Sequence, residues 1–267
     1  MAPVHFQIMS DLHLEAHPAY DFNFTQTAPY LALLGDTGHL VDDGFFEYLE
    51  TQTRRYSAVF FLLGNHEPRG MSFTSAKARV RAFAERMEAA RLQSSIGRFI
   101  FLDQTRYDIS DTLTILGCTL FSHIPAEKED AVTNRLADFK TISDWGVPNH
   151  NAAHQSDLNW LNSQVSEISD KEPQRQIMIF SHHSPCTEDR AVDARHRGSQ
   201  AMSGFATDLR EELCWKSPAV RAWAFGHTHF NVSFTDERGL EVIANQKGYS
   251  IIPKGTFNPD RVYTIGS

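Results

Sequence analysis

The sequence predicts an α/β fold on two observations. Apolar runs of strand length alternate with segments of helical spacing along most of the 267 residues, which is the pattern of α/β architecture. Five of the apolar runs also end in a short polar cluster that contains Asp, Asn or His. Because ligands bind beyond the carboxyl ends of strands in α/β sheets, these clusters predict one shared functional site.

The expected elements follow in chain order. Phe83 and Met87 lie one turn apart in a segment rich in Ala, Arg and Glu, which is typical of a helix, whereas β-branched residues favour a strand at residues 113–120. Strands are expected at residues 4–9, 30–34, 58–63, 99–102, 113–120, 176–180 and 219–225, then at 230–234 and 240–244 as a hairpin, and at 261–265 as an edge strand. Helices are expected at residues 45–55, 75–92 and 154–168.

Residues 122–170 interrupt this alternation. They contain no convincing strand, and they hold Trp145, Trp160 and at least one helix. We interpret them as a helical insertion or cap within a single domain that spans residues 1–267. The insertion is expected to cover the site and to select the substrate. Its polar candidates for the pocket wall are His123, Asn134, Asp138 and His154.

Composition and charge exclude several classes of protein. The formal net charge is −8 and no run of Lys or Arg occurs, so we expect no extended nucleic acid as partner. The three cysteines are far apart, which argues against a disulfide framework or a Cys-x-x-Cys zinc site. The N-terminus lacks the pattern of a signal peptide, and the longest apolar run, residues 58–63, is far too short to span a membrane. We therefore expect a cytoplasmic protein without membrane attachment, and the oligomeric state stays open.

The polar clusters supply a mixed set of oxygen and nitrogen ligands. The candidates are Asp11, His13, Asp36, Asn65, His182, His227 and His229. The set has no thiolate, and imidazoles with carboxylates suit zinc, iron or manganese better than calcium. Seven ligands exceed the needs of one such ion but fit two ions that share a carboxylate, an arrangement known for phosphate displacement. We expect Asp11 and His13 in an extended chain, where residues two apart point to the same side, and likewise His227 and His229.

In this order the clusters resemble the calcineurin-like metallophosphoesterases. The family pattern is Asp-x-His, Gly-Asp, Gly-Asn-His-Glu, a later His and Gly-His-x-His, and all five blocks occur between residues 11 and 229. Within the family, the chain is similar to a branch of small soluble members. The resemblance implies a four-layer αββα sandwich of two mixed sheets flanked by helices, with two divalent metal ions. It implies that Asp36 bridges the ions, that Asp11, His13 and His229 hold one, and that Asn65, His227 and either His182 or His183 hold the other.

The resemblance also bears on residues next to the ligands. His66 matches the position of the family's proton donor or phosphate-stabilising group, and Glu67 is expected to orient a ligand histidine or His66. The apolar run ends at Phe180, which favours His182 over His183 as the ligand; His183 would then contact phosphate or a ligand.

One departure from the family concerns the protein phosphatases. Their Gly-Asp block continues to an arginine that holds phosphate, and no arginine follows Asp36 here, which argues against a protein substrate. Arg69 could supply the cation instead, although a solvated loop arginine fits the sequence equally well.

The function we expect is the hydrolysis of a small phosphate ester that depends on two metal ions. A metal-bridging hydroxide would attack the phosphorus of a phosphomonoester or phosphodiester, with manganese, iron or zinc as the metals. A nucleotide or cyclic-nucleotide phosphodiesterase remains an alternative. The other alternative is a non-catalytic binding scaffold with the same fold, against which the intact ligand set and His66 argue.

Overall fold

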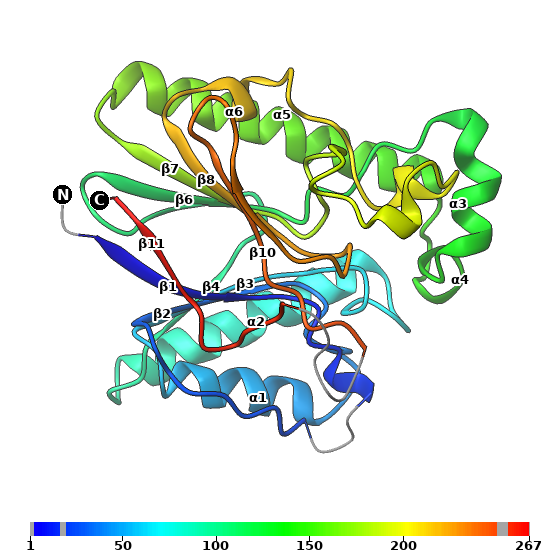
Figure 1. The fold of residues 1–267 in the computed structure, drawn as a ribbon. Helices are drawn as coiled ribbons and strands as arrows, with labels where there is room; N and C mark the ends of the chain where they lie inside the picture. The colour runs from blue at the N-terminus through cyan, green and yellow to red at the C-terminus, as the bar shows by residue number, and fades with distance from the viewer. Residues whose placement is uncertain (1–2, 17–19, 250–255, 267) are drawn as a thin grey trace.

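The computed structural model describes residues 3–16, 20–249 and 256–266, and two β-sheets face each other at its centre (Figure 1). The first sheet has the strand order β11-β1-β2-β3-β4, and the second has the order β5-β6-β7-β8-β10-β9. The first sheet consists of β1 (Val4–Met9), β2 (Tyr30–Leu34), β3 (Ala58–Leu62), β4 (Arg98–Phe101) and β11 (Val262–Ile265). The second consists of β5 (Thr105–Asp108), β6 (Leu113–Gly117), β7 (Gln176–Phe180), β8 (Val220–Phe225), β9 (Val232–Thr235) and β10 (Glu241–Ala244).

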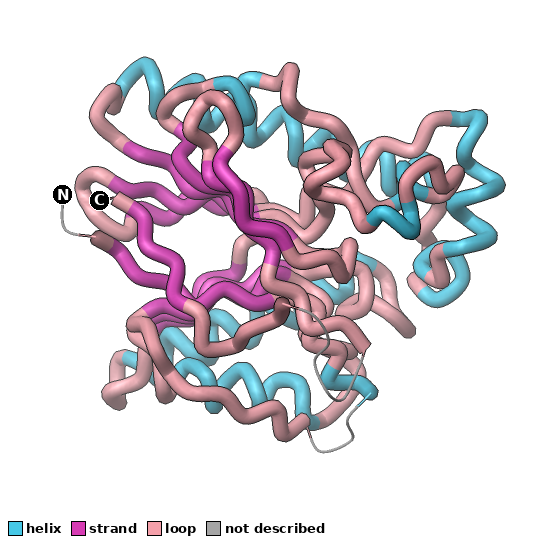
Figure 2. The backbone as a smooth tube through the Cα atoms, viewed as in Figure 1, coloured by secondary structure: helices cyan, strands magenta, loops and turns pink. Residues whose placement is uncertain are grey.

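Helices cover the outer faces of both sheets (Figures 1 and 2). Helices α1 (Gly44–Thr53) and α2 (Phe73–Arg91) lie on the first sheet, and α5 (Val147–Lys171) and the short α6 (Leu213–Lys216) lie on the second. Both sheets are mixed, because β11, β5 and β9 run antiparallel to their neighbours while the other pairs are parallel. The predicted four-layer αββα sandwich is therefore confirmed.

The layers arise because successive side chains of a strand point to opposite faces of its sheet. In β3, Val59 and Phe61 face the core under the helices, whereas Ala58, Phe60 and Leu62 face the core between the sheets. A strand that is buried on both faces needs apolar residues at every position, which is why the central strands read as continuous apolar runs. Burial of each large side chain contributes about 1.5–3 kcal/mol.

The same topology brings the polar clusters together. Strands β1, β2 and β3 are parallel in one sheet and β7 and β8 are parallel in the other, so each of the five clusters lies at a carboxyl end. Two contacts tie the ends of the sheets to each other. His182 Nδ1 lies 2.9 Å from the carbonyl oxygen of Leu34, and the Thr119 hydroxyl donates to the carbonyl of Leu63 at 2.8 Å.

Residues 122–170 behave as two parts. Helices α3 (Glu129–Arg135) and α4 (Asp138–Thr141) form a lobe beside the sandwich, which we call the α3–α4 corner (Figure 1). In contrast, α5 buries Leu158, Leu161 and Val165 against the second sheet and belongs to its helical layer. The division of residues 1–267 into one domain with a helical insertion at 122–170 stays a prediction. Among the described residues, no helix combines the length and apolarity that crossing a membrane requires.

Candidate metal centre

The loops that carry the expected ligands have an unusual backbone. Five expected ligands, Asp11, His13, Asp36, His227 and His229, have positive φ angles between 49° and 69°. The expectation of an extended chain at Asp11 and His13 and at His227 and His229 is therefore wrong, because each of these residues lies in the left-handed region. Such a conformation costs roughly 1–3 kcal/mol for a residue other than glycine and persists where the surroundings enforce it, often at functional sites.

Hydrogen bonds between the loops enforce these conformations. The backbone N–H of His13 donates to the carbonyl of Asp36 at 2.9 Å, and that of Asp11 donates to Gly35 at 3.0 Å. The N–H of His227 donates to the carboxylate of Asp11 at 3.0 Å. Each loop is thus held by a second loop, and all of them are fixed relative to one another.

The absence of a side chain at Gly64 allows Asp36 and His182 to approach its backbone closely. A Cβ atom at Gly64 would collide with Asp36 Oδ1 and with the ring of His182. The glycine before Asn65 is therefore required by contact with the neighbouring loop. We infer that the Gly-Asn-His-Glu block begins with glycine to let Asp36 reach the centre of the site.

One group of ligands surrounds Asp11. His229 Nε2 lies 3.2 Å from Asp11 Oδ1 and 2.9 Å from His13 Nε2. Ligand atoms from these three residues lie within 4.8 Å of one another, and Asp11 and His13 are fully buried. This geometry and donor set fit one divalent metal ion.

A second group lies on the other side of Asp36. It contains Asp36, His182 and His227, whose ligand atoms also lie within 4.8 Å of one another. Asn65 joins it, because its Oδ1 lies 3.0 Å from His182 Nε2. The two oxygens of Asp36 face different groups: Oδ1 is 3.5 Å from His182 Nε2, and Oδ2 is 4.0 Å from His13 Nε2. Asp36 is therefore placed as a shared ligand would be.

The electrostatics of the site divide the expected ligand histidines: burial lowers the pKa of His227 to about 3, whereas the pKa of His182 is raised. Although burial favours the neutral ring, the carboxylate of Asp36 raises the pKa of His182 to about 10. Burial would also favour a neutral Asp36, yet the rings of His66 and His182 hold its pKa well below the usual range. Bound divalent metal ions would supply the positive charge beside these carboxylates in place of protonated histidines, with release of protons from the histidine rings. The residues present thus fit a pair of divalent cations.

The two neighbouring histidines differ in their contacts. His182 points one ring nitrogen at a backbone carbonyl and the other at Asn65 and Asp36, which is how metal-bound histidines are commonly oriented. His183 is buried between the rings of Phe121 and His227, and neither of its ring nitrogens has a hydrogen-bond partner among the described residues. The geometry favours His182 as the ligand, and the ligand roles of all seven residues stay predictions.

His66 lies at the edge of the ligand groups and is held by a carboxylate that the sequence did not single out. Its Nδ1 is 2.7 Å from Glu15 Oε1, and the same oxygen is 3.0 Å from His13 Nδ1. The other ring nitrogen, Nε2, is 3.0 Å from the hydroxyl of Tyr249. The spacing Asp-x-His-x-Glu is the signal that could have revealed Glu15.

Glu67 does not have the expected partner. Its carboxylate accepts three backbone N–H groups, from Gly64 at 2.8 Å, Thr37 at 2.7 Å and Asp36 at 3.1 Å. The expectation that Glu67 orients a ligand histidine or His66 is therefore wrong in this structure. Glu67 instead fixes the loops around Asp36, and burial together with the charge of Asp36 raises its pKa to about 7.

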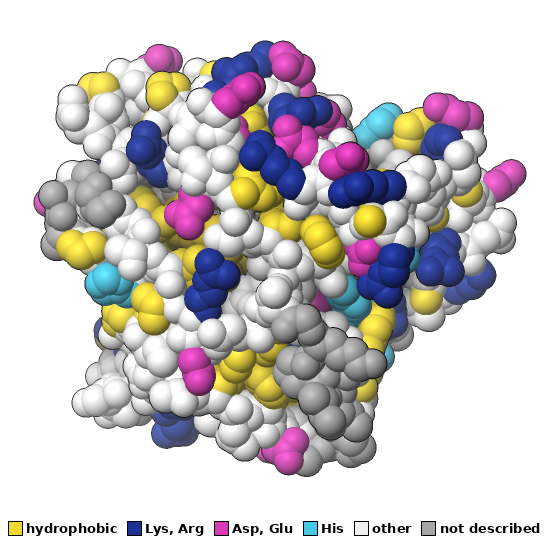
Figure 3. Space-filling view, viewed as in Figure 1, with side chains coloured by type: hydrophobic (Ala, Val, Ile, Leu, Met, Phe, Trp, Pro, Cys, Tyr) yellow, Lys and Arg dark blue, Asp and Glu magenta, His cyan; other side chains and the backbone are white. Residues whose placement is uncertain are grey.

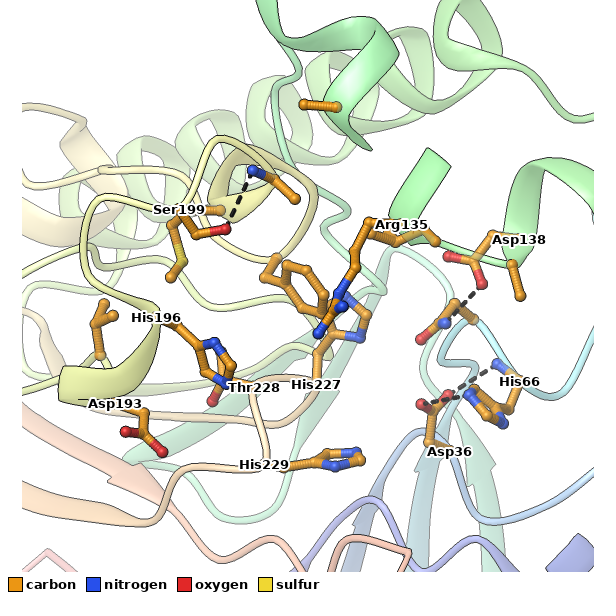
Figure 4. Close-up of a pocket in the computed structure, with 18 of the residues that line it drawn as sticks. Asp36, His66, Arg135, Asp138, Asp193, His196, Ser199, His227, Thr228 and His229 are labelled. Carbon is orange, nitrogen blue, oxygen red and sulfur yellow. Dashed lines mark hydrogen bonds and ion pairs between the residues drawn. The ribbon is translucent and has the colours of Figure 1, made fainter. Parts of the chain in front are cut away.

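A cavity of about 740 Å³ opens above the ligand groups (Figure 4). Its floor includes Asp36, Asn65, His66, His227 and His229. Of the four polar candidates from the insertion, Asp138 lines the cavity, while His154 is buried with its Nδ1 3.0 Å from the carbonyl of Leu120. His123 and Asn134 are exposed and lie outside the cavity wall.

Asp138 connects the α3–α4 corner to an expected metal ligand (Figure 4). Its buried carboxylate accepts a 2.8 Å hydrogen bond from Asn65 Nδ2, which leaves Asn65 Oδ1 directed at the second group. Arg69, the expected cation, donates to the same carboxylate at 3.4 Å and is therefore partly neutralised. The corner thus determines which end of the Asn65 amide faces the metal centre.

This contact yields a prediction about metal affinity. In Asp138→Ala we expect the affinity for one of two metal ions to fall about 10–100-fold, since outer partners of metal ligands have effects of this size. Titration of stripped protein with manganese measures both affinities. Asp157→Ala is the matched control, because Asp157 is a buried carboxylate of the same insertion that contacts Leu120 and Gln104. Equal affinities in the two variants would contradict the prediction.

Comparison with known sequences gives a family-level match. Residues 5–231, most of the chain, match the family described as Calcineurin-like phosphoesterase. A curated relative, Uncharacterized protein L509 of Acanthamoeba polyphaga mimivirus, is 25% identical over 271 aligned positions that cover 94% of this chain and 93% of the relative.

Comparison with solved structures supports the fold. The phosphopantetheinyl hydrolase of Mycobacterium tuberculosis matches with a TM-score of 0.68 and 15% identity, over 93% of this chain and 90% of that chain. A dimetal phosphatase of Danio rerio matches with a TM-score of 0.50 and 16% identity, over 92% and 88% of the two chains. Identities this low support a shared fold and carry no information about substrate.

Proposed function

The chain belongs to the calcineurin-like phosphoesterase family, and from this premise we propose that it hydrolyses organic phosphate esters with two metal ions. The observation that carries the proposal is the position of Asp36, whose two oxygens face two separate groups of ligands. Manganese, iron or zinc suits these carboxylate and imidazole donors. Asp11, His13 and His229 would hold one ion, Asn65, His182 and His227 the other, and Asp36 would contact both.

The chain's own residues account for the remaining chemistry. When bound, two metal ions polarise the phosphoryl group and lower the pKa of a water molecule. His66 lines the cavity with its Nε2 3.8 Å from Asp36 Oδ2, and this nitrogen would hold a proton for the oxygen of the departing alcohol or for a phosphoryl oxygen. Glu15 accepts from Nδ1 and fixes the orientation of the ring. Although burial favours the neutral ring, Asp36 and Glu15 raise the pKa of His66, which supports a proton-holding role.

Hydrolysis of two chromogenic esters tests the proposal. Protein stripped of metal and then reloaded with manganese is offered a phosphomonoester and a phosphodiester side by side. We expect turnover only after reloading, and the ratio of the two rates decides between phosphatase and phosphodiesterase. Protein that binds two manganese ions but hydrolyses neither these esters nor a panel of nucleotides would contradict the proposal. Protein that takes up no metal would favour the binding scaffold.

A further inference from the structure

The arginines of the cavity wall differ in how far they are neutralised. Arg69 donates to Asp138 at 3.4 Å, and Arg195 forms an ion pair with Asp193 at 2.6 Å. Arg135 also lines the cavity, but it forms no hydrogen bond or ion pair with any residue that the structure describes. Of these three side chains, only that of Arg135 keeps its full charge and all its donors for a ligand.

Packing fixes the part of the backbone that carries Arg135. It ends α3, and the flanking Val132 and Leu136 are buried in a small apolar cluster of the α3–α4 corner. Phe205 packs on that cluster and also stacks on the ring of His227, with 4.9 Å between the ring centroids. The corner is thus anchored to the metal centre by Phe205 as well as by the bond between Asp138 and Asn65.

The side chain of Arg135 is exposed and lines the cavity. Figure 4 shows it extending from the end of α3 toward His227, above the floor that contains Asp36. On the surface, Lys and Arg side chains gather along the side of the α3–α4 corner that borders the body of the protein (Figure 3). A guanidinium held over a metal centre is suited to a phosphate, because its donors match two oxygens of one phosphoryl group.

The rest of the cavity wall is largely apolar. Apolar side chains of the α3–α4 corner and of the loops after β7 face the same space as Arg135, namely Leu136, Val192, Ala201, Met202 and Phe205. A cavity of about 740 Å³ is far larger than a phosphate group needs and falls in the range of sites for whole small molecules. The wall therefore provides room and apolar contact for the organic part of an ester.

We propose that Arg135 binds a phosphoryl oxygen of the scissile phosphate, and that the organic part of the substrate is bulky and partly apolar. This proposal rests on the proposed function and names its substrate class. Arg135 thereby supplies, from the α3–α4 corner, the phosphate-binding cation that is missing after Asp36 in the sequence.

Inorganic phosphate tests the role of Arg135 directly. Calorimetry on the manganese-loaded protein measures phosphate affinity without any turnover. We expect Arg135→Gln to weaken phosphate binding by about 10–100-fold, as for a charge-assisted bidentate contact, and Arg135→Lys to restore part of it. Lys140→Gln is the matched control, since Lys140 is an exposed cation of α4 outside the cavity wall. An Arg135→Gln affinity within twofold of the unchanged protein would overturn the role of Arg135.

Alkylphosphonates test the apolar wall, because they resemble phosphate esters and are not hydrolysed. From methyl- to hexylphosphonate we expect the affinity to rise by up to about fourfold for each methylene that becomes buried. Equal affinities for the short and the long compounds would overturn the predicted substrate class.

The proposed function and the role of Arg135 can be contradicted independently of each other. Weaker phosphate binding in Arg135→Gln without hydrolysis of any ester by the unchanged protein would contradict the proposed function and leave the role of Arg135 intact. Hydrolysis that Arg135→Gln leaves unchanged in kcat and KM, together with unchanged phosphate affinity, would overturn the role of Arg135 alone.

Discussion

Asp36→Asn is expected to remove both metal ions and to reduce ester hydrolysis to the level of chelated protein. Asparagine keeps the shape of the side chain but loses its charge and one acceptor oxygen, and the two oxygens of Asp36 face different ligand groups. Outer partners of metal ligands already contribute about 10–100-fold to affinity, so the loss of a shared ligand should cost more than roughly 100-fold. Metal content after gel filtration, together with a manganese titration, measures the effect.

Asp103→Asn serves as the control for this experiment. Asp103 is a half-buried carboxylate that forms ion pairs with Lys77 and Arg81 and takes no part in the ligand groups. We expect it to retain both ions and full activity. Two tightly bound ions in Asp36→Asn, with a circular dichroism spectrum like that of the control, would show that Asp36 is not a shared ligand.

The sequence was most informative where burial on both faces of a sheet dictates composition. The run at β3 is apolar throughout because it contacts two cores, and such runs could be located within one or two residues, except that the strand expected at residues 113–120 ends at Gly117. Strand β5 was missed for the opposite reason. Its residues Thr105–Asp108 are half-exposed at a sheet edge, where pairing with β6 rather than side-chain burial holds the backbone. The short helices of the α3–α4 corner gave no clear periodicity either.

The functional site, like the fold, could be predicted only in part from the sequence. The sequence predicts the set of residues that meet at the site, because parallel strands bring their carboxyl ends to one edge of a sheet. How they gather could not be predicted, since the left-handed backbone at Asp11 and His13 depends on hydrogen bonds from loops distant in sequence. Likewise, the sequence predicts a histidine partner for Glu67, whereas backbone N–H groups occupy its carboxylate, and only the fold shows that Glu15 holds His66. Arg135 looks like any exposed helix residue until the corner is placed over the cavity.

His66→Ala is expected to keep both metal ions and to lower the kcat for an alkyl phosphate ester by about 10²–10⁴-fold, the usual contribution of a positioned proton donor. The reason is geometric. The ring lies next to the ligand groups, but Glu15 holds Nδ1 and the Tyr249 hydroxyl lies 3.0 Å from Nε2, so protein groups rather than a metal ion orient the ring; a substrate oxygen would take the place of the Tyr249 hydroxyl at Nε2. His123→Ala is the control, because His123 is an exposed histidine outside the cavity wall. Loss of metal from His66→Ala would show that His66 is a ligand instead.

Two roles are open to His66, and the fall in kcat of His66→Ala, measured with two different esters, distinguishes them. A proton donor matters most for a poor leaving group such as an alkoxide, and matters little for nitrophenolate, which departs without a proton. If His66 protonates the departing oxygen, the kcat of His66→Ala should fall far more for an alkyl ester than for a chromogenic nitrophenyl ester. If His66 instead donates to a phosphoryl oxygen, both esters should lose similar factors, because the same oxygen is stabilised in both reactions. We expect the first result, since Glu15 and Asp36 raise the pKa of the ring and so favour the proton that an alkoxide requires.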